Sequence, residues 1–353
     1  KLAEVKKVYQ YVKMERITDR DFDFKITNDY DFWNLNKFQI LWKLLEDGIA
    51  IESGEIPTVD LNADASAIIH VPVTSELSAD HEYFINFYFS LKHATAWSPQ
   101  GHVLASDQFR IGNWLQVAKI PRKELPRIHV EKSGNSIKLS GEQFKVDFDT
   151  ENFNLKNLIY DDQEILRNSE GFKLNWYRSI SNDKYTDLRY YPTSESTIKK
   201  SFSKAEDGKS YILTAVKEVL IDRPGAAVSL KYDISYEVFA NGTIEVHSTF
   251  KKPENEPLIR RLGLQLELDP EFNKIEWYGR GPIENYTDRK TAAFVGRYQK
   301  TVSEMASEEY INSQSQGNRE NIRWVEMSSG SGKAFKISSL NVLSFSAIPF
   351  TDQ

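Results

Sequence analysis

Strict alternation of apolar and polar residues along most of the chain limits its fold more than any other feature. In residues 228–238 every second side chain is apolar, and the pattern resumes over 244–250 after the dipeptide Asn241-Gly242. Successive side chains of a β-strand point to opposite faces, so this alternation predicts strands with one buried face. An Asn-Gly pair between two such runs predicts a tight hairpin. We therefore expect an all-β, antiparallel protein.

The N-terminal third carries the same pattern in shorter runs. Residues 38–44 alternate up to the turn dipeptide Asp47-Gly48, and residues 83–91 alternate in the same way. Several strands without a convincing helix between them predict an immunoglobulin-like β-sandwich over residues 15–120. Residues 1–14 differ because their apolar side chains are spaced as on a helix, and we expect a short helical linker there.

A change of composition separates this region from the rest of the chain. Residues 121–127 hold two prolines and four charged residues, which is typical of a linker between domains. Residues 128–353 contain many alternating runs, including 262–268, and predict a large antiparallel supersandwich. The Ser- and Gly-rich stretch 328–333 is expected to be a flexible loop.

Composition excludes several classes of protein. With 40% hydrophobic and 27% charged residues, the 353-residue chain can bury substantial cores, so a disordered chain is excluded. The lack of cysteine rules out disulfides and thiolate zinc sites. A net charge of −6 argues against a nucleic-acid partner. No apolar run reaches the roughly 18 residues of a membrane span, so no membrane partner is expected. The compartment is left open.

Motif searches exclude more chemistry than they identify. The sequence contains no phosphate-binding loop, no HExxH zinc motif, no GxSxG nucleophile elbow and no EF-hand loop. Its six histidines are scattered without the spacing of metal ligands. We predict no metal and no cofactor in this chain.

One segment, residues 277–298, is unusually dense in glycine, aromatic and charged residues. One interpretation is structural: the glycines supply positive φ angles, and the acidic side chains pair with the arginine. The alternative is contact with a sugar, because aromatic faces beside bidentate polar groups are typical of carbohydrate sites. The residues concerned are Gly279, Gly281, Pro282, Glu284, Asn285, Tyr286, Asp288 and Arg289.

A second segment, residues 171–184, has the pattern of a strand that leads into a polar loop. Trp176 and Tyr177 end the strand-like part, and Arg178, Asn182 and Asp183 follow. Core aromatic residues with a solvated loop form one interpretation. Contact between the loop and a ligand is the other, since binding residues often lie on loops held by a rigid scaffold.

Three motifs occur along the chain in a fixed order. The first motif, residues 95–109, is similar to the pattern T-x-W-x-x-x-G-H. The second, residues 279–293, reads GRGPIENYTDRKTAA and is similar to G-x-G-P-x-E-N-Y-x-D-R. The third, residues 308–327, is similar to a motif ending in G-N-R-x-x-x-R-W. Together they resemble the C-terminal region of family 2 glycoside hydrolases of the β-galactosidase type. The motif residues outside the first segment are Trp97, His102, Asn318, Arg319 and Trp324.

The resemblance implies a role for each half. Residues 15–120 would be the immunoglobulin-like fourth domain of such an enzyme, and 128–353 the beginning of its galactose-mutarotase-like fifth domain, truncated before the closing strands. The family's two catalytic glutamates lie in a preceding (β/α)8 barrel, so none is carried over. We expect this chain alone to be inactive, with the barrel and a galactoside as its partners. Relatives of this kind are often homo-oligomers.

Departures from the family pattern affect the candidate binding residues. The family run R-A-P-x-D-N-D appears here over residues 178–183, without its proline and first aspartate. Arg178, Asn182 and Asp183 remain and are the candidate substrate-binding residues. The family's P-Q-E-x-G appears over 313–317 without the proline and glutamate.

Alternative functions follow from these observations. The first is a non-catalytic C-terminal portion of a retaining β-galactosidase that supports the barrel and shapes its pocket. The second is a stand-alone carbohydrate-binding module that uses the supersandwich segments 171–184 and 277–298. A third, an active epimerase, would need a histidine and a carboxylate placed for proton transfer, and only His129 and His247 are available in that domain.

Overall fold

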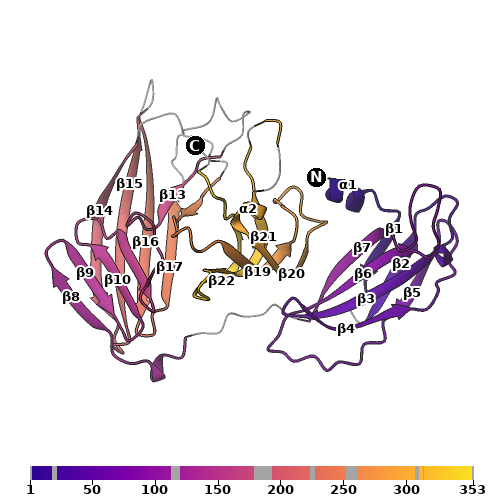
Figure 1. Cartoon of the computed structure of the whole chain (residues 1–353), viewed down its shortest axis with the longest axis horizontal. Coiled ribbons are helices and arrows are strands. Elements are labelled where there is room, and N and C mark those ends of the chain that lie inside the picture. Colours follow the sequence, from indigo (N-terminus) through magenta and orange to yellow (C-terminus); the bar gives the residue numbers. More distant parts are fainter. Residues whose placement is uncertain are drawn as a thin grey trace.

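The protein folds almost entirely into antiparallel β-sheets, as the alternation predicts (Figure 1). The computed structural model describes residues 2–17, 22–112, 120–178, 193–222, 227–251, 259, 261–306, 310–312 and 314–351. The all-β fold class is confirmed. No helix within these ranges is long and apolar enough to cross a membrane.

The first unit is a sandwich of a three-stranded and a four-stranded sheet. The three-stranded sheet has the order β1 (Val12–Arg16), β2 (Asp23–Asn28) and β5 (Ser66–His70). The four-stranded sheet has the order β4 (Ile49–Ile56), β3 (Phe38–Glu46), β6 (Tyr83–Leu91) and β7 (Val103–Ile111). Aromatic rings fill the space between them, with the Phe24 ring 4.9 Å from that of Phe87. Alternation places these rings inside because each strand turns one face to the other sheet.

Strand β6 is buried along nearly its whole length and therefore differs from an ordinary sandwich strand. Tyr83, Ile85 and Phe87 belong to the core between the two sheets. Phe84 lies on the opposite face and packs in a separate cluster with residues of the second half of the chain. A strand that is apolar on both faces is covered on both faces, and the second covering layer comes from the C-terminal half.

The N-terminal helix is shorter than its sequence pattern suggests. Helix α1 spans Leu2–Val8, and strand β1 already begins at Val12, inside the predicted linker. Val12 is fully buried in the core of the sandwich, whereas none of the α1 residues is buried. Tertiary packing thus overrides helical spacing at Val12. Two 3₁₀ turns complete this part, η1 (Leu35–Lys37) and η2 (Arg122–Glu124), the latter within the predicted linker.

The second unit contains three larger sheets and one two-stranded sheet. The first sheet has the order β12 (Gln163–Glu164), β11 (Leu155–Tyr160), β10 (Phe144–Asp149), β9 (Ser136–Ser140) and β8 (His129–Ser133). The second has the order β14 (Thr193–Lys204), β15 (Ser210–Ile221), β16 (Val228–Phe239) and β17 (Ile244–Lys251). The third has the order β20 (Phe294–Thr301), β19 (Lys274–Gly281), β21 (Arg319–Ser328) and β22 (Ala334–Phe345). The short pair is β13 (Lys173–Asn175) with β18 (Gly263–Gln265), and the short helix α2 spans Val302–Met305.

One continuous hydrophobic core joins these sheets. The ring of Phe148 on β10 lies 5.1 Å from that of Tyr236 on β16, which packs the first sheet against the second. In the third sheet, the Trp277 ring lies 6.1 Å from that of Phe345. Aromatic pairs of this kind bury large areas and fix the spacing of the layers.

Both hairpins predicted from turn dipeptides are confirmed. Asp47 and Gly48 join β3 to β4 with φ angles of 46° and 83°, the positive pair of a type I′ turn. The turn at Asn241-Gly242 joins β16 to β17, and Gly242 has a φ of 86°.

The Ser- and Gly-rich residues 328–333 form the turn between β21 and β22, where the Ser329 amide donates to the Lys333 carbonyl at 2.9 Å, and their flexibility stays a prediction. One local prediction is wrong in detail. Of the alternating run 262–268, only the three residues of β18 form a strand, and Leu262 and Leu264 are exposed. Leu266 and Leu268 instead pack against the core of the second unit, Leu268 beside an isolated bridge to Leu166.

Candidate functional site

The two C-terminal sequence motifs lie side by side in the third sheet and its adjoining loops. Strand β19 pairs antiparallel with β21, and the loop after β19 continues this contact. There the Asn285 amide donates to the Asn318 carbonyl at 3.0 Å, and the Asn318 side chain donates back to the Asn285 carbonyl at 2.8 Å. The Asn285 side-chain oxygen accepts from the Glu320 amide at 2.9 Å. The asparagines therefore bind the two motifs together through backbone groups.

A buried carboxylate, Glu284, forms the centre of this cluster. It accepts hydrogen bonds from the Arg289 guanidinium and the Tyr310 hydroxyl, and from the Gly317 amide at 2.8 Å. Burial, together with the bond to Glu284, raises the pKa of Tyr310 to about 12. The Tyr286 hydroxyl donates to the Ser315 carbonyl at 2.8 Å, and burial raises its pKa. These hydrogen bonds connect the loop after β19 to residues 310–317.

Arg319 is the most completely buried charged residue of the third motif. Its guanidinium donates to the carbonyls of Pro282 and Asn318, both at 3.0 Å. It also stands 5.4 Å from the centre of the Trp277 ring. A buried guanidinium that donates to two carbonyls and packs on an aromatic face holds the loop after β19 in place, because losing these contacts would carry a large desolvation cost.

The motif glycines serve close approach rather than unusual backbone angles. Neither Gly279 nor Gly281 has a positive φ, so the interpretation based on positive φ is wrong for both. A Cβ atom at Gly279 would stand 2.8 Å from the Ile322 Cα, and one at Gly281 would stand 2.6 Å from the Tyr298 ring. Both glycines are therefore required where β19 touches its neighbours. Pro282 follows Gly281 through a cis peptide bond.

Asp288 differs from its neighbours in the motif. It is exposed, and within the described ranges it has no hydrogen bond or ion pair, whereas Glu284 and Arg289 pair with each other. The expected pairing of acidic side chains with the arginine is therefore found for Glu284 and not for Asp288.

The candidate substrate-binding loop is described only at its first residue. Arg178 is half-buried and follows Trp176, which packs against the core of the second unit. The Tyr177 carbonyl accepts from Arg261 at 3.4 Å, so this part of the chain is held next to the segment before β18. Asn182 and Asp183 lie outside the described residues, and their role stays a prediction.

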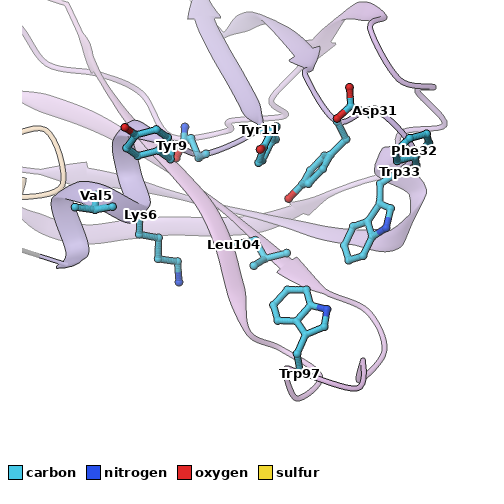
Figure 2. A pocket seen from close by; sticks show the side chains of 11 residues that line it. Val5, Lys6, Tyr9, Tyr11, Asp31, Phe32, Trp33, Trp97 and Leu104 are labelled. Carbon is cyan, nitrogen blue, oxygen red and sulfur yellow. The ribbon is translucent and has the colours of Figure 1, made fainter.

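The motif of residues 95–109 lies in the first unit, and its signature residues Trp97 and His102 lie apart from the other two motifs. Trp97 is 62% exposed and stacks on Trp33, with ring centres 6.4 Å apart (Figure 2). His102 lies 3.4 Å from the Lys6 ammonium group, next to α1. These residues therefore line a different region of the molecule from the Glu284 cluster.

Sequence reasoning missed a buried ionic junction between the two units. Glu82, which is 0% exposed, accepts from Arg323 at 2.8 Å (Nε) and 2.6 Å (Nη2). It also accepts from the Tyr278 hydroxyl at 2.7 Å. Leu45, Phe84, Tyr278 and Val295 form a small apolar cluster at the same interface, with Trp324 packed at its edge. Burial, together with the negative charge of Glu82, raises the pKa of Tyr278.

Further hydrogen bonds extend this junction on both sides. The Gln108 side chain makes a paired contact with Val295, accepting from its amide at 2.7 Å and donating to its carbonyl at 2.8 Å. The Glu4 carboxylate accepts from the amides of Thr291 and Ala292, each at 2.9 Å. The Arg297 amide donates to the carbonyl of Gly48 at 3.1 Å. The 279–293 motif is thus fastened to the first unit as well as to its own sheet.

One signal in the sequence could have indicated this junction. Strand β6 reads YFINFYFSL, with Phe84 and Tyr88 on the face opposite its core residues. An antiparallel strand that faces water on one side carries polar residues there. Aromatic residues on both faces therefore indicate a second contact surface, although they do not identify the partner.

The contacts of these clusters join protein groups to one another. Among the residues that the structure describes, Glu82 and Glu284 are the two buried carboxylates, and each binds an arginine and a tyrosine hydroxyl. Within the described ranges, histidine and acidic side chains do not gather in threes at a spacing suited to a metal ion. Trp324 is covered by the cations of Lys336 at 4.1 Å and Arg297 at 5.5 Å from its ring centre.

The fold and its junction define an all-β protein of two sandwich units joined by buried ionic and apolar contacts. Residues 140–353 match the family model described as the β-galactosidase small chain, and residues 24–112 match that of β-galactosidase domain 4. The chain belongs to the β-galactosidase small-chain family.

Curated relatives agree with this assignment. The chain is 24% identical to a β-galactosidase of Priestia megaterium over 99% of its own length and 34% of the relative. It is 25% identical to one of Halalkalibacterium halodurans, over 96% of this chain and 33% of the relative. For one of Lactobacillus delbrueckii subsp. bulgaricus the identity is 27%, over 99% and 34%. The chain thus spans about a third of the length of the curated relatives it matches.

Proposed function

We propose that this chain is the non-catalytic part of a retaining β-galactosidase, in which it supports the catalytic barrel and forms one wall of the substrate pocket. The observation that carries the proposal is the buried junction of Glu82, Arg323 and Tyr278. A junction in which a fully buried carboxylate binds an arginine and a tyrosine of the other unit holds the two units in one relative position, which is what a supporting scaffold requires.

The state of the buried carboxylates supports a non-catalytic role. A retaining glycosidase needs two carboxyl groups about 5 Å apart on either side of the sugar, one acting as nucleophile and one as acid and base. Glu82 and Glu284 instead each accept three hydrogen bonds from groups of the protein itself, including an arginine and a tyrosine. Carboxylates bound in this way hold protein segments together, which suits a supporting role.

The pocket wall would come from residues that follow β13. Arg178 lies two residues after Trp176, which packs against the core of the second unit, so the scaffold holds this point of the chain. In the proposal, Arg178, Asn182 and Asp183 contact the galactoside. Their polar side chains suit the hydroxyl groups of a sugar.

The test compares this chain with the longer product of the same gene on a panel of nitrophenyl glycosides. We expect the chain alone to give no turnover, and the longer protein to hydrolyse the β-galactoside. Substitution of Arg178 by Ala in the longer protein should raise KM, with Lys173→Ala, an exposed residue of β13, as the matched control. Turnover by the chain alone would contradict the proposal.

A further inference from the structure

A cavity of about 490 Å³ lies in the first unit, away from the Glu284 cluster and from the junction. Figure 2 shows side chains of α1 on one side of this cavity, Trp33 and Trp97 on the other, and Leu104 between them. Its volume is within the range of about 300–1,000 Å³ that small-molecule sites occupy. The motif residue Trp97 forms part of the cavity wall, and the contacts of the Glu284 cluster and of the junction do not account for its presence in the motif.

The wall of the cavity is a continuous series of stacked rings. Tyr11 stacks on Tyr30 at 5.0 Å, Tyr30 on Trp33 at 5.5 Å, and Trp33 on Trp97 at 6.4 Å, with interplanar angles of 24°, 28° and 25°. Tyr30, the second ring of the series, also contacts Phe38 of the buried core. It ends at Trp97, which is 62% exposed. The core therefore holds in place a flat aromatic surface that faces solvent.

Polar groups with no protein partner stand at the edge of these rings. Neither the Asp31 carboxylate nor the Tyr30 hydroxyl makes a hydrogen bond to another residue within the described ranges. Burial raises the pKa of Tyr30, so its hydroxyl keeps its proton and can donate. Lys6, on the wall formed by α1, is positively charged and Asp31 is negatively charged. The two charges cancel, so this pair leaves the lining neutral.

We propose that this cavity binds a neutral pyranose saccharide of two or more units. A pyranose ring presents a face of C–H groups, which packs on a flat aromatic ring, and an edge of hydroxyl groups. The aromatic series supplies the first contact, and Asp31 and Tyr30 supply an acceptor and a donor for the second. The balanced charges of Lys6 and Asp31 favour a neutral ligand over an ionic one.

This site goes beyond the proposed function, because it lies in the first unit and requires neither a barrel nor the loop after β13. A purely apolar cover over the rings would leave the Asp31 carboxylate and the Tyr30 hydroxyl buried without partners, which is costly. A ligand with both an apolar face and hydroxyl groups satisfies both parts of the cavity.

Titration of the 353-residue chain with lactose, cellobiose and maltose, followed by tryptophan fluorescence and calorimetry, tests the proposal. We expect a saturable change with at least one of them and a dissociation constant in the millimolar range. Trp97→Ala should weaken that binding at least tenfold, and Asp31→Asn severalfold. Leu340→Ala, at a residue that is also 62% exposed but lies on β22, should leave binding unchanged.

Several outcomes would overturn the proposal. One is the lack of any saturable signal from the three sugars while thermal unfolding shows an intact fold. Another is equal binding by the Trp97→Ala variant and the unsubstituted chain. A fluorescence change that follows protein concentration rather than sugar would assign the rings to contact between copies of the chain. None of these results depends on whether the longer protein is a galactosidase, so the two proposals fail separately.

Discussion

The buried carboxylates Glu82 and Glu284 use the same chemistry in two different parts of the molecule. Each binds one arginine and one tyrosine hydroxyl. The partners of Glu284 lie 5, 26 and 33 residues further along the chain. Those of Glu82 lie 196 and 241 residues away. The first carboxylate therefore closes a local motif, and the second joins two units that fold from separate parts of the chain.

The two sites also differ in how far their charges are removed from water. At the junction the side chains of Arg323 and Glu82 are 10% and 0% exposed. In the Glu284 cluster the side chain of Arg289 is 20% exposed and that of Glu284 is 3% exposed. A charge that keeps some contact with water loses less when its partner is removed. We therefore expect the junction to be the more sensitive of the two.

The largest effect should come from Glu82→Gln. This change leaves the Arg323 guanidinium buried without a counter-charge, which destabilises a protein by about 3–5 kcal/mol. Because the junction couples the units, calorimetry should resolve two unfolding transitions in place of one. Glu55→Gln, at an exposed residue of β4, is the matched control and should stay within about 0.5 kcal/mol. A stability loss below about 1 kcal/mol, with a single unfolding transition, would contradict the expectation that the junction is the more sensitive site.

Glu284→Gln should have a smaller and local effect. Arg289 can turn toward water, so we expect a loss of about 2–3 kcal/mol, the cost of hydrogen bonds to a charged group. Chemical denaturation should show this loss without separation of the two units. Asp288→Asn, in the same loop but exposed, should be neutral. Equal losses for Glu284→Gln and Glu82→Gln would show that the distance between partners in sequence has no energetic consequence.

The two tyrosines sharpen the comparison with a smaller change. Tyr278→Phe removes a hydroxyl that donates to a fully buried carboxylate, and we expect a loss of about 1.5–3 kcal/mol. Tyr310→Phe removes the corresponding hydroxyl from a half-buried ring, and we expect about 0.5–1.5 kcal/mol. Both values come from urea unfolding curves. A larger loss for Tyr310→Phe would reverse the order of the two sites.

The smallest effect should come from an exposed carboxylate–arginine pair, which serves as the solvent-screened reference. Its bond to Arg122 lowers the pKa of Asp207 from 3.8 to about 2. A folded pKa below the unfolded value gives stability that is present above about pH 4 and lost as the pH falls toward 2. Asp207→Asn should therefore lower the stability at pH 7–8, where the pair is fully charged, and match the unsubstituted chain near pH 2, so that the profile between these limits is flatter. Added salt should weaken the contribution of this exposed pair more than those of the buried Glu82 and Glu284. An unchanged acid profile would contradict the assignment.

Local sequence patterns were sufficient for much of the fold. Alternation over residues 228–250 and 83–91 predicted strands that the structure contains, because a period of two is a property of neighbouring residues. Asp47-Gly48 predicted its turn because few residues accept two positive φ angles. The same reasoning was wrong in detail at residues 262–268, where the alternation continues over seven residues but only Gly263–Gln265 form a strand.

The sequence indicated which residues belong to the candidate site, but it did not indicate what each of them contacts. The segment with Glu284, Asn285 and Arg289 stood out because its special residues are close together in sequence. The reason for Gly279 could not be read in advance, since it depends on Ile322 of another strand. The aromatic cavity likewise brings Tyr11 and Trp33 together with Trp97, from distant parts of the chain.

The sequence by itself determined the all-β class, the two hairpins and the motif that belongs to the β-galactosidase family, because each is encoded in neighbouring residues. Only the tertiary structure decided that Glu82 meets Arg323 and Tyr278, and that Trp97 closes a series of stacked rings. A buried charge gains its stability from partners that complete folding brings within hydrogen-bond distance. Those partners leave no periodic trace in the sequence, and the fold alone places them.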